Sequence, residues 1–432
     1  MANKSLASRK QTVIAIFLVF GFIYLVRLFY IQVIDKSYTL SANNNVLRYV
    51  TQYPARGLIY DRNGKLLVYN EAVYDLMVLP VQVKQIDTAE FCRLLEITKE
   101  GFIDRMEKAK KYSRYKPSLF EKQISKETYG YLEEKMYRFP GFFVQPRTLR
   151  YYPKPIGAHL FGYVGEVTQG VIDKNPYYKS GDYIGISGIE KSYEEELRGI
   201  KGMKIKMVDV HNREVGSFQD GKYDSAAIMG HDLYLSIDAD LQEYGELLMQ
   251  GKMGSVVAIE PASGEILAFL SSPGYDPNLL VGRVRGKNFG ILSNDPVKPL
   301  LNRAMMGAYP PGSTFKMVND LIGIQEGVLD LGTHYTCQGK ASSPIRCTHN
   351  HQSPLNVEVA IQQSCNPFHW QVFKSILNNR AKGGIRENYV RWRNYVMSLG
   401  FGHKLGTDLM FELSGNIPSA EKYDAIYGKG HW

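Results

Sequence analysis

The hydrophobic pattern begins with one long apolar run, from Thr12 to Ile34, which is interrupted by Arg27. Such a run is long enough to cross a bilayer core of about 30 Å. Lys4, Arg9 and Lys10 precede it. Because cytoplasmic flanks carry an excess of cations, the pattern predicts an uncleaved single-pass anchor that exports the rest of the chain. A cleaved signal peptide is the alternative, but the run exceeds a usual h-region and no Ala-x-Ala site follows.

Shorter patterns after the anchor predict a β-rich region with a helical insertion. Alternating residues flank Arg62-Asn63-Gly64, which predicts a hairpin turn. The stretch Ala89–Tyr137 is charged and apolar at every third or fourth position, which is typical of helices. We therefore expect a small helical head, around residues 86–140, inserted between strands.

The pattern changes again beyond Asp232. Leu233–Ile237 alternates as a strand, and a helix-like run begins at Asp240. Gly254–Ile259 and Glu265–Phe269 are two strand-like segments joined by a Pro-Ala-Ser-Gly turn. They predict a hairpin in a second, mixed sheet with helices on both faces.

The clearest chemical pattern is Ser-x-x-Lys at Ser313 and Lys316, after the loop-ending Pro310-Pro311-Gly312. The next residues form a broad apolar stripe at helical spacing, which predicts a buried helix against the 254–269 hairpin: Phe315, Met317, Val318, Leu321, Ile322 and Ile324. Residues three apart share a helix face, so Lys316 lies over Ser313. Burial disfavours an ammonium, so this lysine can act as a base that activates Ser313 as a nucleophile.

The tetrapeptide also occurs at Ser113–Lys116 and Ser419–Lys422, without the Pro-Gly breaker and the apolar helix. There we expect solvated polar pairs. For Ser313 itself the alternative is a helix N-cap, in which the hydroxyl accepts a backbone hydrogen bond.

Composition sets wider limits on function. A chain of 432 residues, 44% hydrophobic and 22% charged, has material for two or three domains. The net charge of +9 is spread along the sequence without a long basic run. This disfavours nucleic acid as a partner, whereas an anionic bilayer or an acidic wall polymer fits.

A second motif, Ser364-Cys365-Asn366, follows a helix-like stretch at Val357–Ile361. Ser-x-x-Lys followed by Ser-x-Asn resembles the penicillin-recognising acyl transferases, which are penicillin-binding proteins and serine β-lactamases. By that resemblance Ser313 would form an acyl-enzyme and Lys316 would be its general base. Ser364 would relay a proton to the leaving amine, and Asn366 would hold the peptide amide of the substrate.

Further segments resemble class B penicillin-binding proteins, and among them the cell-elongation transpeptidases. They are Tyr53–Lys65, Arg150–Pro153, His159–Gly165, Gly185–Glu190 and Ser414–Pro418. Those before residue 231 look like pedestal motifs, which we expect to be turns and packing glycines without chemistry.

The resemblance implies an α+β fold in several parts. Residues 1–11 would be a cytoplasmic tail and 12–34 the transmembrane anchor. Residues 35–231 would form a pedestal (dimerisation-type) domain that carries the head, and 232–432 a transpeptidase domain. The protein would lie in the inner membrane with its catalytic domain in the periplasm.

The family's third motif, Lys-Thr/Ser-Gly on a strand edge, should follow the other two. The one match, Lys179-Ser180-Gly181, precedes Ser313 in a loop-like stretch and is interpreted as a decoy. That motif supplies a cation for the substrate carboxylate, and its strand supplies half of the oxyanion hole. Losing one oxyanion donor costs about 100- to 1,000-fold in rate. We therefore expect a chain truncated within its transpeptidase domain, whose own activity is open.

The implied reaction is the cross-linking of peptidoglycan stem peptides during cell elongation, without a catalytic cofactor. Ser313 would attack the D-Ala-D-Ala carbonyl, D-Ala would leave, and an amine from a neighbouring stem would resolve the ester. β-Lactams would acylate the same serine. Implied partners are a polytopic glycan polymerase and a rod-shape scaffold. The alternatives are a catalytically inactive scaffold, a β-lactam-sensing receptor and a β-lactamase.

Cysteines add a second hypothesis. Cys92 fits a packing residue, whereas the other three lie near the active-site motifs. Some elongation-type relatives carry zinc at comparable places, so Cys337, Cys347, His351 and Cys365 would give a closed four-ligand set that fastens the Ser364–Asn366 segment. A Cys337–Cys347 disulfide and free thiols are the alternatives.

Overall fold

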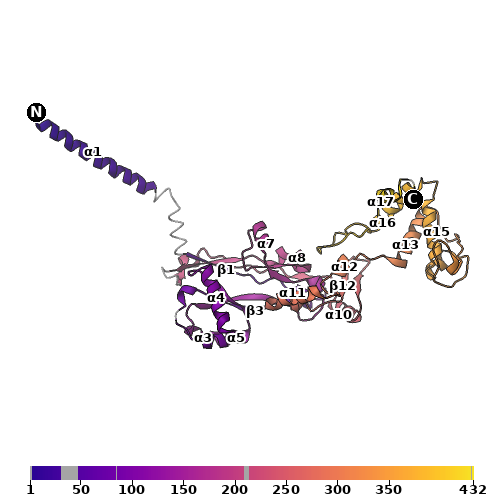
Figure 1. Cartoon of the computed structure of the whole chain (residues 1–432), viewed down its shortest axis with the longest axis horizontal. Coiled ribbons are helices and arrows are strands. Elements are labelled where there is room, and N and C mark those ends of the chain that lie inside the picture. The colour runs from indigo at the N-terminus through magenta and orange to yellow at the C-terminus, as the bar shows by residue number, and fades with distance from the viewer. Residues whose placement is uncertain (1, 31–46, 84, 209–213, 430) are drawn as a thin grey trace.

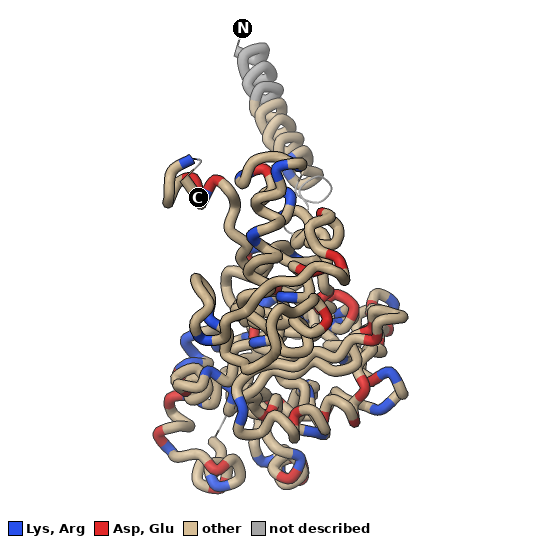
Figure 2. Tube along the Cα trace, turned by 90° about the vertical axis from the view of Figure 1, so that its right-hand side faces the viewer, with Lys and Arg blue, Asp and Glu red and all other residues tan. Residues whose placement is uncertain are grey.

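The computed structural model describes residues 2–30, 47–83, 85–208, 214–429 and 431–432. The molecule is elongated (Figure 1), with helix α1 at one end and helices α13, α15, α16 and α17 at the other. Strands and short helices fill the middle. Figure 2 shows cations and anions interspersed over this folded part, in line with the predicted spread of charge.

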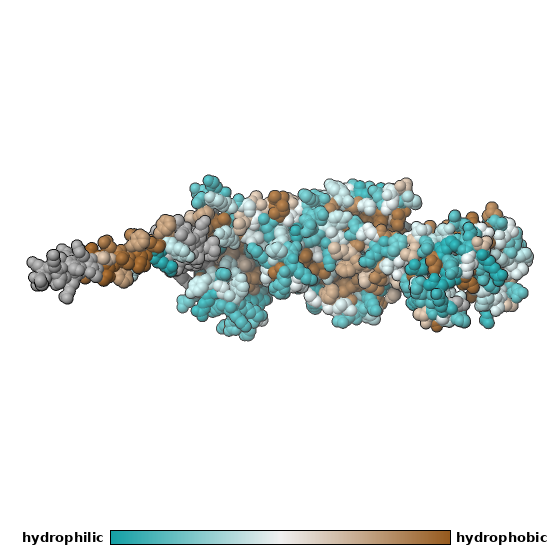
Figure 3. Space-filling view, turned by 90° about the horizontal axis from the view of Figure 1, so that it is seen from above, coloured by the Kyte–Doolittle hydropathy of each residue, from teal (hydrophilic) through white to brown (hydrophobic). Residues whose placement is uncertain are grey.

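Helix α1 spans Ala2–Phe29. Its apolar side chains from Val13 onward are exposed, and they form the brown stretch beside the grey tip in Figure 3. Within the described ranges, no helix has both the length and the apolar character needed to cross a membrane. The last part of the predicted anchor, residues 31–34, lies outside the described residues.

A five-stranded sheet forms the centre of the first half. Its strands are β2 (Ile59–Tyr60), β3 (Leu66–Val78), β4 (Ser118–Ile124), β5 (Phe142–Tyr151) and β10 (Leu233–Tyr234). The order is β10-β2-β3-β4, with β5 also paired to β3. The sheet is mixed, because β10 runs parallel to β2 and the other pairs are antiparallel. Of the predicted strand Leu233–Ile237, only Leu233 and Tyr234 form a strand, and this strand extends the central sheet.

The predicted turn at Asn63-Gly64 is confirmed between β2 and β3. Gly64 has φ +80°, a conformation that glycine adopts without strain. The Asp61 carboxylate accepts hydrogen bonds from the backbone amides of Asn63 (2.8 Å) and Lys65 (2.7 Å). The side chain of Asp61 thus fixes the loop that sets the register of the hairpin.

The head is helical as predicted, with one exception. Its helices are α3 (Thr88–Leu94), α4 (Lys99–Tyr112) and α5 (Lys126–Lys135), each capped at its start by a serine, threonine or aspartate side chain. Strand β4 lies within the stretch predicted to be helical. It pairs with β3 and buries Phe120 and Ile124 in the head core. This long-range pairing outweighs the local helical pattern.

The other strands before residue 231 form two further antiparallel sheets. They are β1 (Leu47–Gln52), β8 (Gly202–Val208) and β9 (Glu214–Ser217) in one sheet, and β6 (Val164–Glu166) with β7 (Tyr183–Gly185). Short helices lie between them: α6 (Ala158–Phe161), α7 (Gln169–Lys174), α8 (Gly188–Ser192) and α9 (Glu194–Arg198). A Cβ atom added at Gly162 or Gly185 would lie 1.9 Å from a backbone carbonyl oxygen. These pedestal glycines are therefore packing residues, as expected.

A buried ionic network joins the predicted pedestal motifs. Arg150 Nε lies 2.6 Å from Glu190 Oε1, and Arg56 Nη2 lies 2.8 Å from Glu190 Oε2 and 2.7 Å from Glu194 Oε2. Burial acts to raise the pKa of Glu190, but the guanidinium groups of Arg150 and Arg56 outweigh burial and hold the pKa below its usual value.

The predicted 254–269 hairpin is confirmed as β11 (Gly254–Ile259) and β12 (Ile266–Ser272). Helices α10 (Ala239–Leu248) and α12 (Arg303–Met306) pack on it. Gln242 of α10 bonds the backbone of Phe269 through both its amide atoms, at 2.8 and 2.9 Å. The expectation that the hairpin packs on the helix after Ser313 is wrong, because α10 and α12 occupy that place and α13 packs on α15.

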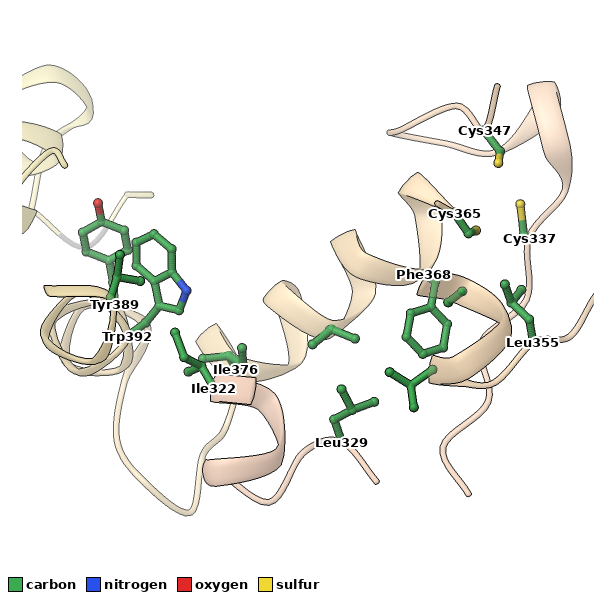
Figure 4. Packing of buried hydrophobic residues seen from close by; sticks show 14 of the residues in the cluster. Ile322, Leu329, Cys337, Cys347, Leu355, Cys365, Phe368, Ile376, Tyr389 and Trp392 are labelled. Carbon is green, nitrogen blue, oxygen red and sulfur yellow. The ribbon is translucent and has the colours of Figure 1, made fainter. Parts of the chain in front are cut away.

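The far end is a helical unit: α13 (Lys316–Gln325), α14 (Val357–Gln362), α15 (Asn366–Leu377), α16 (Ile385–Ser398) and α17 (Ala420–Tyr427). Its core extends from three cysteine thiols at one end to Tyr389 and Trp392 at the other (Figure 4). The predicted apolar stripe of α13 is only partly buried. Ile322 lies in the core, whereas Met317, Leu321 and Ile324 are exposed.

Candidate active site

Ser313 lies at the exposed start of the helical unit. It belongs to a 3-10 turn, Gly312–Phe315, which leads directly into α13. The backbone amide of Lys316 donates to the Ser313 carbonyl oxygen, which closes the turn. Among the described residues, none forms a hydrogen bond with Ser313 Oγ, so the hydroxyl is open to a ligand.

The three Ser-x-x-Lys copies differ in what their serines do. Ser113 Oγ accepts from the backbone amide of Lys116, and Ser419 caps α17 by accepting from the amide of Lys422. Both are local capping bonds, where solvated polar pairs were expected. Ser313 makes no such bond, so the N-cap interpretation does not describe it.

Lys316 connects the two sequence motifs. Its Nζ lies 2.8 Å from the Ser364 carbonyl oxygen, 3.0 Å from Ser364 Oγ and 2.6 Å from Asn366 Oδ1. The amide nitrogen of Asn366 donates to the Arg346 carbonyl oxygen at 3.3 Å. The structure therefore brings Lys316, Ser364 and Asn366 together, with Ser313 in the turn that precedes Lys316.

The surroundings of Lys316 lower its pKa. Burial lowers the pKa of Lys316, while the nearby Cys365, Cys347 and Asp320 act to raise it, and the pKa remains below its usual value. A lysine with a lowered pKa is a better proton acceptor near neutral pH.

Ser364 adopts a backbone conformation that is uncommon for a residue with a side chain. Its φ is +50°, between the end of α14 and the start of α15. The backbone amide of Ser364 donates to Ile361 (3.0 Å) and that of Cys365 to Ala360 (2.9 Å), which closes α14. The left-handed turn directs both the carbonyl and the hydroxyl of Ser364 at Lys316. Such strain is typical of functional sites.

One buried pair beside these residues was not predicted from the sequence. Asp320 Oδ1 lies 3.0 Å from His369 Nδ1, which joins α13 to α15. The signal was present: Asp320 is an acid within the apolar stripe of α13, four residues after Lys316, and His369 lies three residues after Asn366.

The predicted ligand set forms a compact cluster. The ligand atoms of Cys337, Cys347, His351 and Cys365 all lie within 4.8 Å of one another, and all four cysteines of the chain are free thiols. His351 Nε2 lies 3.4 Å from Cys347 Sγ, while His351 Nδ1 bonds the Gln352 carbonyl oxygen at 2.9 Å.

These atoms fit a tetrahedral zinc ion. Zinc–sulfur bonds of about 2.3 Å place neighbouring ligand atoms roughly 4 Å apart, which agrees with the cluster. A histidine that donates through one ring nitrogen to a carbonyl oxygen offers the other as a ligand, as His351 does. Burial acts to raise the pKa of Cys347, but hydrogen bonds from the His349 backbone, His351 and the Asn366 backbone lower it to about 6. A thiolate at Cys347 suits a metal.

Lys179-Ser180-Gly181, interpreted as a decoy, makes none of the contacts described for Lys316. It forms a turn before β7, where the Asp182 carboxylate accepts from the Lys179 amide at 2.7 Å.

Family descriptions match most of the chain. "Penicillin-binding Protein dimerisation domain" matches residues 51–235, and "Penicillin binding protein transpeptidase domain" matches residues 254–430. The chain belongs to the penicillin-binding protein family. This bears out the resemblance, and with it the two-domain α+β fold.

Curated penicillin-binding relatives are similar over nearly the whole chain. The peptidoglycan D,D-transpeptidase MrdA of Acinetobacter baumannii is 33% identical over 410 residues, which cover 91% of this chain and 58% of that protein. MrdA of Escherichia coli is 32% identical over 423 residues, covering 92% and 63%. The chain thus spans about three fifths of the length of these relatives.

A solved structure shares the fold. It is a complex between penicillin-binding protein 2 and MreC from Helicobacter pylori. Its matching chain superposes with a TM-score of 0.70 at 24% identity, covering 89% of this chain and 72% of that one.

Proposed function

We propose that this penicillin-binding protein is a peptidoglycan D,D-transpeptidase of cell elongation, that it forms an acyl-enzyme on Ser313, and that β-lactams acylate the same serine. The observation that carries the proposal is the set of contacts made by Lys316. One amine reaches both residues of a second motif, Ser364 and Asn366, that lies far along the chain. The curated relatives named as D,D-transpeptidases support the same reaction.

The contacts of Lys316 support a proton route. A neutral amine has two N–H donors and one lone pair. The Ser364 carbonyl oxygen and Asn366 Oδ1 can only accept, so they take the two donors. The lone pair is then free for a hydroxyl hydrogen, from Ser313 during attack or from Ser364 Oγ at 3.0 Å.

In the proposed reaction Ser313 Oγ attacks the penultimate D-Ala carbonyl as Lys316 takes its proton. Ser364 then passes its proton to the leaving amine and takes one from the Lys316 ammonium, so that D-Ala departs and Lys316 is neutral again. An amine from a neighbouring stem attacks the ester, Lys316 takes the proton that this amine loses, and Ser313 Oγ receives that proton as the ester bond breaks. Asn366, at the start of α15, holds the peptide amide of the substrate.

Adduct mapping tests this proposal. Native cells that produce the protein are treated with a fluorescent penicillin, and the labelled peptide is identified by mass spectrometry. We expect the adduct on Ser313. An adduct on Ser113, Ser364 or Ser419 would contradict the assignment.

We also propose that residues 12–34 anchor the protein in the inner membrane, with the pedestal, residues 35–231, and the transpeptidase domain, residues 232–432, in the periplasm. The apolar run from Thr12 to Ile34 and the cations Lys4, Arg9 and Lys10 before it support the anchor. The complex of the Helicobacter pylori protein with MreC supports a rod-shape scaffold as a partner. A polytopic glycan polymerase is the second partner that we propose.

Finally, we propose that Cys337, Cys347, His351 and Cys365 hold one structural zinc ion. The closeness of the four donors and the orientation of His351 support this proposal. A bound zinc would supply no step of the reaction. It would fasten the loop that carries Cys337 and Cys347 to Cys365, and so to the segment Ser364–Asn366.

A further inference from the structure

Two buried side chains, those of Asp320 and His369, lie one helical turn further along the chain from the contact between Lys316 and Asn366. Asp320 follows Lys316 by four residues on α13, and His369 follows Asn366 by three on α15. Residues at these spacings share a helix face. The two helices therefore face each other through two successive contacts: Lys316 Nζ to Asn366 Oδ1 (2.6 Å) and Asp320 Oδ1 to His369 Nδ1 (3.0 Å).

The second contact is buried and directional. Asp320 is 3% exposed and His369 is 4% exposed. A carboxylate can only accept, so His369 Nδ1 carries the hydrogen of this bond. His369 Nε2 faces the Ala360 carbonyl oxygen of α14 at 3.4 Å. The imidazole thus lies between α13 and α14, the helix that leads into Ser364.

The free-energy cost of burying this pair indicates that the two residues do more than fill space between the helices. Burying a carboxylate costs free energy that an apolar side chain in the same stripe would avoid. Within the described part of the chain, Asp320 Oδ2 has no hydrogen-bond partner, which adds to that cost. Apolar packing could fill the space, but it does not fix which turn of one helix lies opposite which turn of the other, because dispersion has no direction.

We propose that Asp320 and His369 are positioning residues: their hydrogen bond fixes α13 against α15 and thereby holds Lys316 Nζ against Ser364 and Asn366. This inference rests on the proposed function for its meaning in catalysis. The placement of Lys316 itself can be measured without catalysis.

The test compares substitutions of His369 through the chemical reactivity of Lys316. Acetic anhydride modifies the purified protein, and mass spectrometry compares the rate at Lys316 with that at Lys422 in the same digest. His369→Leu should raise the Lys316 rate on the order of tenfold, equivalent to one lost hydrogen bond to a charged group. His369→Asn should restore the original rate, because its amide nitrogen can take the place of Nδ1.

His159→Leu is the matched control. His159 is also buried and also bonds a carbonyl oxygen, that of Pro299, but it lies outside the helical unit. Its loss should leave Lys316 modification unchanged. Equal Lys316 rates in the unaltered protein and His369→Leu would overturn the inference.

A double variant covers the case in which His369→Leu does not fold. Replacing both members of a buried pair by apolar residues is often tolerated. Asp320→Leu/His369→Leu should melt near the unaltered protein while Lys316 remains fast to react. Slow modification in this folded variant would also overturn the inference.

Penicillin acylation of Ser313 in the same variants separates the two proposals. We expect His369→Leu to slow acylation on the order of 10- to 100-fold, as small misplacements do, and His369→Asn to restore it. If the unaltered protein is not acylated while Lys316 still responds to His369, the proposed function fails and the positioning role stands.

Discussion

Lys316 reaches its position through contacts from a segment that lies far away in the sequence. Its neighbours Ser364 and Asn366 approach it because Ser364 turns through a left-handed conformation between two helices. Local sequence cannot encode this contact. Three serines share the same tetrapeptide, and only the surroundings of Ser313 leave its hydroxyl without a backbone bond.

At this scale we predict the effect of removing the amine. Lys316→Met keeps most of the side-chain volume but removes the base, and general base catalysis contributes about 100- to 10,000-fold. Penicillin acylation of Ser313 should fall by that factor. The control variant Lys422→Met changes another copy of the tetrapeptide, and its Ser313 should be acylated at the original rate. Equal rates in the two variants would contradict the role of Lys316.

A second prediction concerns acid stability. The folded pKa of Glu190 lies below its usual value, so its contribution to the free energy of unfolding is full above the unfolded pKa, near 4.3. This contribution is lost as the pH falls through the lower, folded value. Glu190→Gln should cost about 3–5 kcal/mol at neutral pH, because it leaves buried arginines uncompensated, and should remove this acid-sensitive part. Urea unfolding at neutral pH and at acid pH measures the free energy of unfolding. The exposed Glu195 provides the control, because Glu195→Gln should change this free energy little at both pH values.

At the scale of elements, the cysteine and histidine cluster is continuous with the segment Ser364–Asn366. Cys337, Cys347 and His351 come from the irregular segment after α13, and Cys365 lies between Ser364 and Asn366. Any bond across this cluster therefore restrains two residues that contact Lys316.

We predict that this restraint depends on zinc. Protein purified without chelator should contain close to one zinc per chain by elemental analysis. Cys365→Ser should lose the metal and melt at a lower temperature, because a site absent from the unfolded chain couples metal binding to folding. The control variant Cys92→Ser, in the head, should keep both the zinc and the original melting temperature. A zinc-free protein in which Cys337 and Cys347 resist alkylation until reduced would favour a disulfide.

Sequence patterns predicted which helices and strands form better than they predicted which of these elements pack or pair with one another. The Asn63-Gly64 turn and the 254–269 hairpin follow from local turn chemistry and alternation, and the structure confirms both. Strand β4 and the placement of Leu233–Tyr234 depend on long-range pairing with β3 and β2, which no local pattern contains. The sequence marks Asp320 as an acid within an apolar stripe, but it does not show that His369 is its partner, because the two meet only when α13 and α15 pack.

At the scale of the whole molecule, the elongated arrangement separates its two ends. The ionic network of Arg56, Arg150 and Glu190 joins the pedestal segments, and the helical unit with Ser313 lies at the end opposite α1 (Figure 1). If α1 lies in the membrane, Ser313 and Lys316 are held away from the membrane surface.

This arrangement predicts a topology. A reporter that is active only in the periplasm, fused after Ser41, should be active, because cations precede the apolar run and its length suffices. The same reporter fused after Lys10 should be inactive. Intact-mass analysis should show an uncleaved N-terminus, and loss of the first residues from the mature protein would contradict the anchor.

The release of D-alanine tests the central claim most directly. The protein purified from its native cells is given a stem pentapeptide that ends in D-Ala-D-Ala, and free D-alanine is measured over time for the unaltered protein, Ser313→Ala and Ser419→Ala. We predict release by the unaltered protein and by Ser419→Ala, none by Ser313→Ala, and a block by penicillin. Release that persists in Ser313→Ala, or its absence from the unaltered protein, would contradict an acyl-enzyme at Ser313.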